Sequence, residues 1–148
     1  MVGSLWLCGV AAATLNPTTS VSSSPPKAGA RPVVLTLALH YEMQCGYPGQ
    51  GPVVIDFPQK MRMPRTLAAS SVLVDGKPAT KVGMIRHQMS VGLTRRTGVI
   101  CDVLGPGTLT IVFDQAADLG NPSRAGAYLV TARNGSLHFA AHLVIKRV

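Results

Sequence analysis

Aromatic and acidic residues are scarce in this sequence of 148 residues, and charge of either sign is low. The chain has one Trp, three Tyr and three Phe, and 14% of its residues are charged. Proteins that bind single-stranded nucleic acids stack the bases on aromatic side chains. Because this chain has few aromatic residues, we expect no nucleic-acid partner. The low charge, combined with 47% hydrophobic residues, also excludes an intrinsically disordered chain.

Recognisable catalytic motifs are absent as well. The sequence has no G-x-S-x-G elbow, no P-loop and no G-x-G-x-x-G pattern. Its six acids form no convincing carboxylate pair of the kind that a glycosidase needs. The four histidines, His40, His87, His138 and His142, belong to no triad signature. We therefore expect a protein that is not an enzyme and needs no cofactor, with an uncharacterised hydrolase as a further alternative.

The N-terminal part differs in composition from the rest of the chain. Residues 1–15 are largely apolar and contain small residues at Ala11–Ala13, which is typical of a secretory signal. The run is shorter than the about 20 residues that span a bilayer, and no Lys or Arg precedes it. Residues 16–31 are rich in Ser, Thr and Pro and predict a flexible linker, which leaves residues 32–148 for the folded domain. We expect a secreted or cell-envelope protein. The alternatives are an uncleaved N-terminal anchor, which would be its membrane contact, and a disordered cytosolic tail.

Three cysteines are present, and export would leave two of them. Cys8 would depart with the signal, so Cys45 and Cys101 remain as an even pair, which in an exported domain usually forms a disulfide. The closed loop of about 57 residues would then stabilise the fold by roughly 4 kcal/mol in the chain-entropy description. Two unpaired buried thiols are the alternative, whereas a zinc site would need more ligands at tighter spacing.

Alternation with a period of two is the strongest structural signal in the sequence. Leu35, Leu37, Leu39, Tyr41 and Met43 fall on one face of an extended chain, which predicts a half-buried strand. Further short runs predict strands at residues 53–57, 72–74, 81–85, 88–93, 98–103 and 108–113. Prolines and glycines separate these runs, and the one candidate for a helical turn is 114–119. The pattern predicts an all-β chain of about seven or eight short strands that form a sandwich of two antiparallel sheets.

The C-terminal region predicts a hairpin. Asn134-Gly135 is a strong signal for a two-residue turn, and we assign the Asn of the sequon Asn134-Gly135-Ser136 to that turn. The apolar face then agrees with the register that the turn sets, as expected when one face is buried. The expected pairs are Ala132–Leu137, Val130–Phe139 and Tyr128–Ala141 on the apolar face, and Thr131–His138 and Ala127–His142 on an outer, solvated face.

Two further segments carry a resemblance to a known kind of domain. Residues 72–79 (VLVDGKPA) place an Asp-Gly turn after a short strand, and residues 119–130 (LGNPSRAGAYLV) lead into a late strand. Both resemble the immunoglobulin-like β-sandwich modules of secreted and S-layer-type bacterial surface proteins. The resemblance spans residues 72–130, and the two cysteines, the basicity and the single copy depart from it. It implies an immunoglobulin-like sandwich and a structural or binding role at the bacterial surface, with no catalytic residues to transfer.

The formal net charge of +8 comes from fourteen Lys and Arg residues and six acids. A balance of this size favours an anionic partner, so the partners we consider are an anionic envelope polymer or another surface protein. The cations are scattered along the sequence, and the residues that we predict to contact such a polymer are Lys60, Arg62 and Arg65 in one loop and Arg95 and Arg96 in another. Charges that only keep the domain soluble are the alternative.

A second group of residues would suit a metal carrier instead. Thioethers and an imidazole gather in two segments, and soft sulfur with imidazole favours copper. Methionines are also common core fillers, and Met84 and Met89 would lie on opposite faces of one continuous strand unless the chain turns near Arg86. The residues of this alternative are Met61, Met63, Met84, His87 and Met89.

Overall fold

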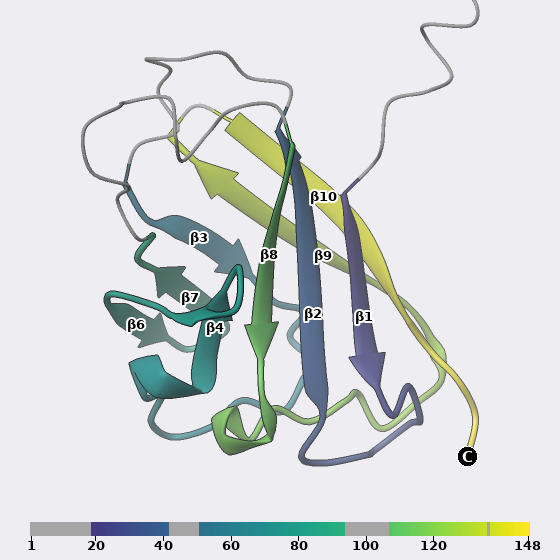
Figure 1. Cartoon of the computed structure of the whole chain (residues 1–148). Coiled ribbons are helices and arrows are strands. Elements are labelled where there is room, and N and C mark those ends of the chain that lie inside the picture. The colour runs from purple at the N-terminus through teal and green to yellow at the C-terminus, as the bar shows by residue number, and fades with distance from the viewer. Residues whose placement is uncertain (1–18, 42–50, 94–106, 136) are drawn as a thin grey trace, which may run out of the picture.

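A computed structural model describes residues 19–41, 51–93, 107–135 and 137–148 (Figure 1). The helices in these ranges are short 3-10 turns, η1 (Ala69–Ser71) and η3 (Gln115–Ala117), and neither is long or apolar enough to cross a membrane. The strands are β1 (Ser20–Ser24), β2 (Val34–Tyr41), β3 (Val53–Asp56), β4 (Val72–Val74), β5 (Lys77–Pro78), β6 (Val82–Ile85), β7 (Gln88–Val91), β8 (Gly107–Phe113), β9 (Gly126–Asn134) and β10 (Leu137–Ile145).

The strands form two antiparallel sheets that face each other (Figure 1). One sheet has the order β1-β2-β8-β4-β5, and the other has the order β10-β9-β3-β7-β6. Because each strand alternates between apolar and polar residues, it can bury only one face, and stacking the sheets buries both apolar faces. The predicted all-β sandwich of two antiparallel sheets is confirmed, although the described part of the chain has more strands than the seven or eight expected.

The central strand β2 shows why alternation predicts this fold. Leu35, Leu37 and Leu39 of β2 are buried, while the residues between them are partly exposed. The pairing of β2 with β8 sets Leu37 opposite Ile111, which is also fully buried. Cross-strand pairs of this kind are the unit that stabilises a sheet.

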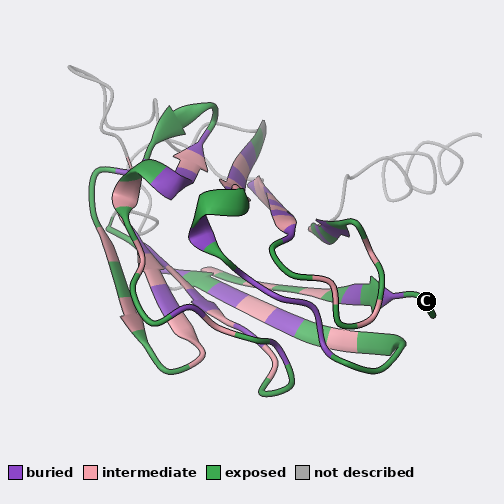
Figure 2. Ribbon diagram, turned by 90° about the horizontal axis from the view of Figure 1, so that it is seen from below, coloured by how far each residue is buried: buried purple, intermediate pink, exposed green. Residues whose placement is uncertain are grey.

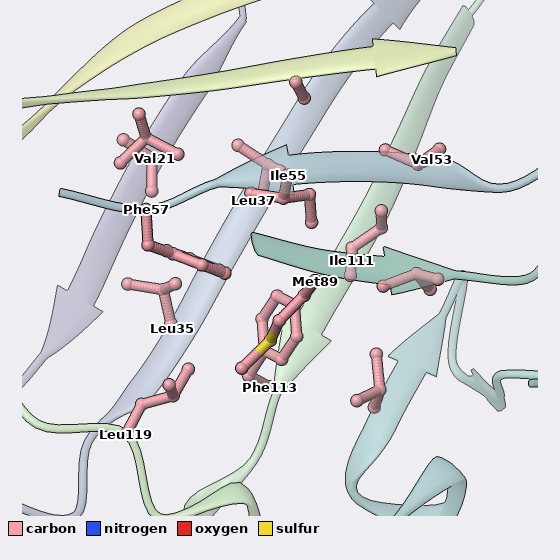
Figure 3. Packing of buried hydrophobic residues seen from close by; sticks show 14 of the residues in the cluster. Val21, Leu35, Leu37, Val53, Ile55, Phe57, Met89, Ile111, Phe113 and Leu119 are labelled. Atoms are coloured by element: carbon pink, nitrogen blue, oxygen red, sulfur yellow. The ribbon is translucent and has the colours of Figure 1, made fainter. Parts of the chain in front are cut away.

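Residues from both sheets meet in one hydrophobic core (Figure 3). Phe57, which follows β3, and Phe113 of β8 pack edge to face, with ring centroids 5.6 Å apart. Leu35 and Met89 are buried beside them. Such close packing across the two layers fixes the distance between the sheets and gives the loops at their ends a rigid support.

Strand β1 corrects the predicted linker. Ser20–Ser24 pairs antiparallel with β2, and its Val21 and Ser23 are buried. A composition rich in Ser and Pro predicts a linker because it offers little to a core, but here β2 supplies the hydrogen-bonding edge and Val21 alone supplies the apolar contact. The linker prediction is therefore wrong for residues 20–24, and the folded part begins before residue 32. The apolar segment 1–15 lies outside the described residues.

The C-terminal hairpin exists, but its register differs from the prediction by two residues. The last pair is Asn134↔Leu137, and Ala132 faces Phe139 instead of Leu137. A shift of two keeps every side chain on its predicted face, so the apolar face is correct and only the partners change. The cause is Asn134, whose side chain is buried and donates to the carbonyl oxygens of Gly51 and Pro52, at 3.1 Å each. These bonds hold Asn134 in the strand and move the turn onward to Gly135.

Two predicted turns form as expected. Asp75 and Gly76 both have positive φ, at 49° and 82°, in the tight turn between β4 and β5. Asp114 caps η3, because its carboxylate accepts a hydrogen bond from the backbone N–H of Ala116. The strand predicted for residues 98–103 lies outside the described residues.

Candidate functional site

The loops at one end of the sandwich are tied to one another by backbone hydrogen bonds. This end lies at the bottom of Figure 1, where β1 and β8 finish and the C-terminus lies. Its segments are residues 25–33, 58–65, 114–125 and 146–148, which we call the basic end. The ties are Gly29 N to Pro122 O (2.8 Å), Asn121 N to Ala30 O (2.9 Å), Arg62 N to Gly120 O (3.0 Å), Gly120 N to Arg62 O (2.9 Å) and Lys146 N to Pro26 O (2.7 Å).

The side chain of Asn121 adds a second kind of tie. It is fully buried, and its amide nitrogen donates to the carbonyl oxygens of Pro25 and Lys27, at 2.9 and 2.8 Å. The loop before β2 is therefore fixed to the loop before β9 by both backbone and side chain. Since buried amide hydrogen bonds are costly to lose, the surface above them is rigid.

Cations gather on this rigid surface. Every Lys and Arg in the four segments is exposed, and Figure 2 looks onto this end from below and shows exposed residues along its loops. The cations are Lys27, Arg31, Lys60, Arg62, Arg65, Arg124, Lys146 and Arg147, and the acids in the same segments are Asp114 and Asp118. More than half of the fourteen cations of the chain thus lie at one end, which produces a concentrated positive potential there.

The two acids at this end neutralise little of that charge. Asp118 accepts two hydrogen bonds from Arg31, from Nε at 3.1 Å and from Nη2 at 2.9 Å. Asp114 is engaged as the cap of η3 and has no ion pair among the described residues. The Arg31–Asp118 pair is exposed, so it adds little stability, but it fixes the orientation of the Arg31 guanidinium.

Gly120 brings two of the cations together. A Cβ atom at this position would stand 3.0 Å from Arg62 Cβ and 3.1 Å from Arg31 Cδ, so both arginine side chains lie against the glycine. Such distances are tighter than nine in ten real Cβ contacts, so a larger residue would require the two arginine side chains to shift by a few tenths of an ångström. Gly120 therefore allows Arg31 and Arg62 to lie this close.

A surface of this kind binds anions. Arginine presents planar donors that match phosphate or carboxylate groups, and several cations in fixed positions favour a ligand with repeated negative charges. The groups that the site presents are exposed guanidinium and ammonium donors, which can hold an anion by charge and hydrogen bonds.

The sequence identified only part of this site. Lys60, Arg62 and Arg65 of the predicted contact loop are indeed at the basic end and exposed. Five other cations, Lys27, Arg31, Arg124, Lys146 and Arg147, were missed because they come from loops far apart in the sequence. Hydrogen bonds between those loops, which no local pattern encodes, bring them together. Arg95 and Arg96 lie outside the described residues, as do Cys45 and Cys101.

The residues of the copper alternative are placed in and around the core. The chain turns at Arg86, so Met84 and Met89 are opposite each other in the β6–β7 hairpin and share a face. Met61 and Met89 are buried members of the core, and Met63 and Met84 pack against it. The ring of His87 lies 3.2 Å, through Nε2, from the backbone oxygen of Met61. In this arrangement the thioethers fill core space, as methionines often do.

The outer face of the C-terminal hairpin carries the two histidines of β10. His138 and His142 are exposed, as predicted for the solvated face. Among the described residues, no three His, Cys, Asp or Glu side chains are close enough to hold a metal ion.

Comparisons with known proteins find a likeness among solved structures. No family model matches the chain, and no curated protein matches it. Among solved structures, the chain is similar to the crystal structure of BslA, a bacterial hydrophobin, with a TM-score of 0.57 and 15% sequence identity. The match covers 88% of this chain and 100% of that chain. At this identity the likeness concerns the fold alone.

Proposed function

We propose that this chain is a non-enzymatic binding or structural module of a bacterial cell surface or envelope, and that its basic end contacts an anionic envelope polymer. The observation that carries the proposal is the gathering of eight exposed cations on hydrogen-bonded loops that contain two acids. Export through residues 1–15 and a Cys45–Cys101 bridge are part of the same proposal. The fold it shares with BslA, a bacterial hydrophobin, is compatible with a role at a surface.

We further propose that the sandwich is of the immunoglobulin-like kind. The orders β1-β2-β8-β4 and β10-β9-β3 correspond to the A-B-E-D and G-F-C sheets of such domains, with β5 and the β6–β7 hairpin as additions. Tyr128, near the start of β9, donates its hydroxyl to the carbonyl oxygen of Arg124, 2.7 Å away and four residues upstream. This bond resembles the tyrosine corner at the corresponding position of immunoglobulin-like domains.

The electrostatic part of the proposal is tested by two variants of equal net charge. Lys60→Gln with Arg65→Gln removes two cations from the basic end, and Lys77→Gln with Lys81→Gln removes two exposed cations from the region of β5 and β6. We expect the first pair to weaken binding to long-chain inorganic polyphosphate by roughly 30-fold, at about 1 kcal/mol for each cation near an anionic surface. The second pair should change binding by less than about threefold.

Isothermal titration calorimetry of the purified chain at low and high salt measures this difference. Binding should weaken strongly between 0.05 and 0.5 M salt, because exposed charges are screened. Equal losses in the two variants would show that net charge alone attracts the polymer. No measurable binding by the unmodified chain to polyphosphate or to an anionic carboxylate polymer would refute the polymer partner and favour another surface protein.

A further inference from the structure

The turn between β6 and β7 has an unfavourable residue at its first position. Ile85 pairs with Gln88, so the turn consists of Arg86 and His87. Arg86 has a φ of 54°, whereas His87 is not among the residues with positive φ. This is the pattern of a type II′ turn, in which glycine is the usual first residue because other side chains are strained there.

The other non-glycine residues with positive φ in the described ranges have a local reason for it. They are Asp75 and Asp118, short polar residues that tolerate the left-handed region. The carboxylate of Asp75 accepts from the backbone N–H of Thr110, and that of Asp118 accepts from Arg31. Arg86 is exposed, and its guanidinium makes no hydrogen bond or ion pair within the described part of the chain. The turn itself therefore does not explain why an arginine is present.

Two contacts fix this turn beside the basic end. The backbone N–H of Phe57 donates to the carbonyl oxygen of His87 at 2.8 Å, and the His87 ring nitrogen lies 3.2 Å from the backbone oxygen of Met61. Met61 is 3% exposed and stands between the exposed Lys60 and Arg62.

The turn thus carries an exposed cation, Arg86, and its second residue, His87, contacts the backbone between the exposed Lys60 and Arg62. Strained residues that break a local rule are found most often at functional sites. The adjacent Ile85 is 74% exposed, so the tip of the hairpin projects both a cation and an aliphatic side chain.

We propose that Arg86 is a contact residue for the anionic polymer and that the β6–β7 turn extends the basic end. The turn holds Arg86 in a strained conformation that directs its guanidinium to the same ligand that Lys60 and Arg62 contact. This inference rests on the proposed function, since it needs a polyanion at the basic end. It assigns a specific role to a turn residue that the charge count alone does not single out.

The test is Arg86→Gly, a change with opposite effects on stability and binding. Glycine relieves the positive φ, so the melting temperature should rise by about 3 °C. The loss of the guanidinium should weaken binding to long-chain polyphosphate by about fivefold. A residue with a merely structural role would not combine higher stability with weaker binding.

Two controls separate this inference from the proposed function. Lys77→Gln removes one exposed charge elsewhere and should leave binding within about twofold, and Arg86→Lys keeps the charge and should retain most of the affinity. Arg86→Gly that binds as tightly as Lys77→Gln, while Lys60→Gln with Arg65→Gln still loses affinity, would overturn the role of Arg86 alone. An unmodified chain that binds no polyanion would overturn the proposed function itself. Arg86→Gly that weakens binding without raising the melting temperature would refute the strain in the turn.

Discussion

The two ends of the sandwich are each held by a buried asparagine, but the two side chains are satisfied differently. At the basic end, the amide nitrogen of Asn121 donates to two backbone carbonyls of the loop before β2. At the opposite end, the amide nitrogen of Asn134 donates to the carbonyls of Gly51 and Pro52, which precede β3. Both side chains have no exposed surface. In each case one side-chain amide nitrogen donates to two backbone carbonyls of a segment that is distant in the sequence.

The oxygens of the two amides mark the difference. Asn134 Oδ1 accepts from the hydroxyl of Tyr41 at 3.3 Å, whereas Asn121 Oδ1 has no partner within the described part of the chain. Tyr41 belongs to β2 and Asn134 to β9, so this bond joins the two sheets across the sandwich. Asn121 joins loop to loop only. The side chain of Asn121 therefore makes fewer hydrogen bonds than that of Asn134, which predicts that the two asparagines differ in their contribution to stability.

The largest effect is expected from Asn134→Ala. The change leaves the buried hydroxyl of Tyr41 without its partner and removes the part-buried hydrogen bonds to the carbonyls of Gly51 and Pro52. A buried unsatisfied hydroxyl costs about 1–3 kcal/mol and each of the other two bonds about 1 kcal/mol, so we expect a loss of roughly 3 kcal/mol in the free energy of unfolding. Chemical denaturation measures it, with Arg133→Ala as the exposed control on the same strand. A loss below about 1 kcal/mol would mean that the Asn134 bonds do not hold this end.

A smaller loss of about 2 kcal/mol is expected from Asn121→Ala, because two carbonyls lose a donor but no buried hydroxyl is left behind. If Asn121→Ala were less stable than Asn134→Ala, the inferred difference between the two asparagines would be wrong.

Asn121→Ala should also weaken polyphosphate binding, since the loop with Lys27 and Arg31 is no longer fixed against the loop with Arg124. Asn134→Ala, which acts at the other end, should leave binding unchanged as long as the chain stays folded.

The same two residues show what the sequence can and cannot predict. Alternation predicted β2, β8 and the inner face of the C-terminal hairpin, because burial of one face depends only on residue order. The Asn134 side chain, by contrast, bonds to residues more than eighty positions away, and that tertiary contact shifts the turn from its locally preferred place. Asn121 lies in the NPS segment that suggested the resemblance, and the structure gives it a structural role.

The candidate site follows the same rule. Lys60, Arg62 and Arg65 could be named because they are close in the sequence. Their neighbour Arg31 could not, because it reaches Arg62 only through the contacts around Gly120. Strand β1 was missed for a related reason: its serines carry no strand signal, and the edge of β2 provides the pairing.

The smallest effect is expected from Tyr41→Phe, which gives Asn134 Oδ1 the unpartnered state that Asn121 Oδ1 already has. At neutral pH the lost hydrogen bond should cost about 1 kcal/mol, so Tyr41→Phe should be less stable than the unmodified protein.

At alkaline pH the variant should become the more stable of the two proteins, because burial raises the pKa of the Tyr41 phenol above its ordinary value of 10.0. Above about pH 10 the unfolded chain loses this proton and the folded chain keeps it, so the stability of the unmodified protein falls by up to about 1.4 kcal/mol per pH unit. Tyr41→Phe lacks this contribution, and the other tyrosines are common to both proteins. The two unfolding free energies should therefore converge and then cross as the pH rises from 9 to 11. If the difference between the two unfolding free energies stayed constant over that range, the folded protein would not protect Tyr41 from ionisation. The Tyr41–Asn134 hydrogen bond between the sheets would then not be buried.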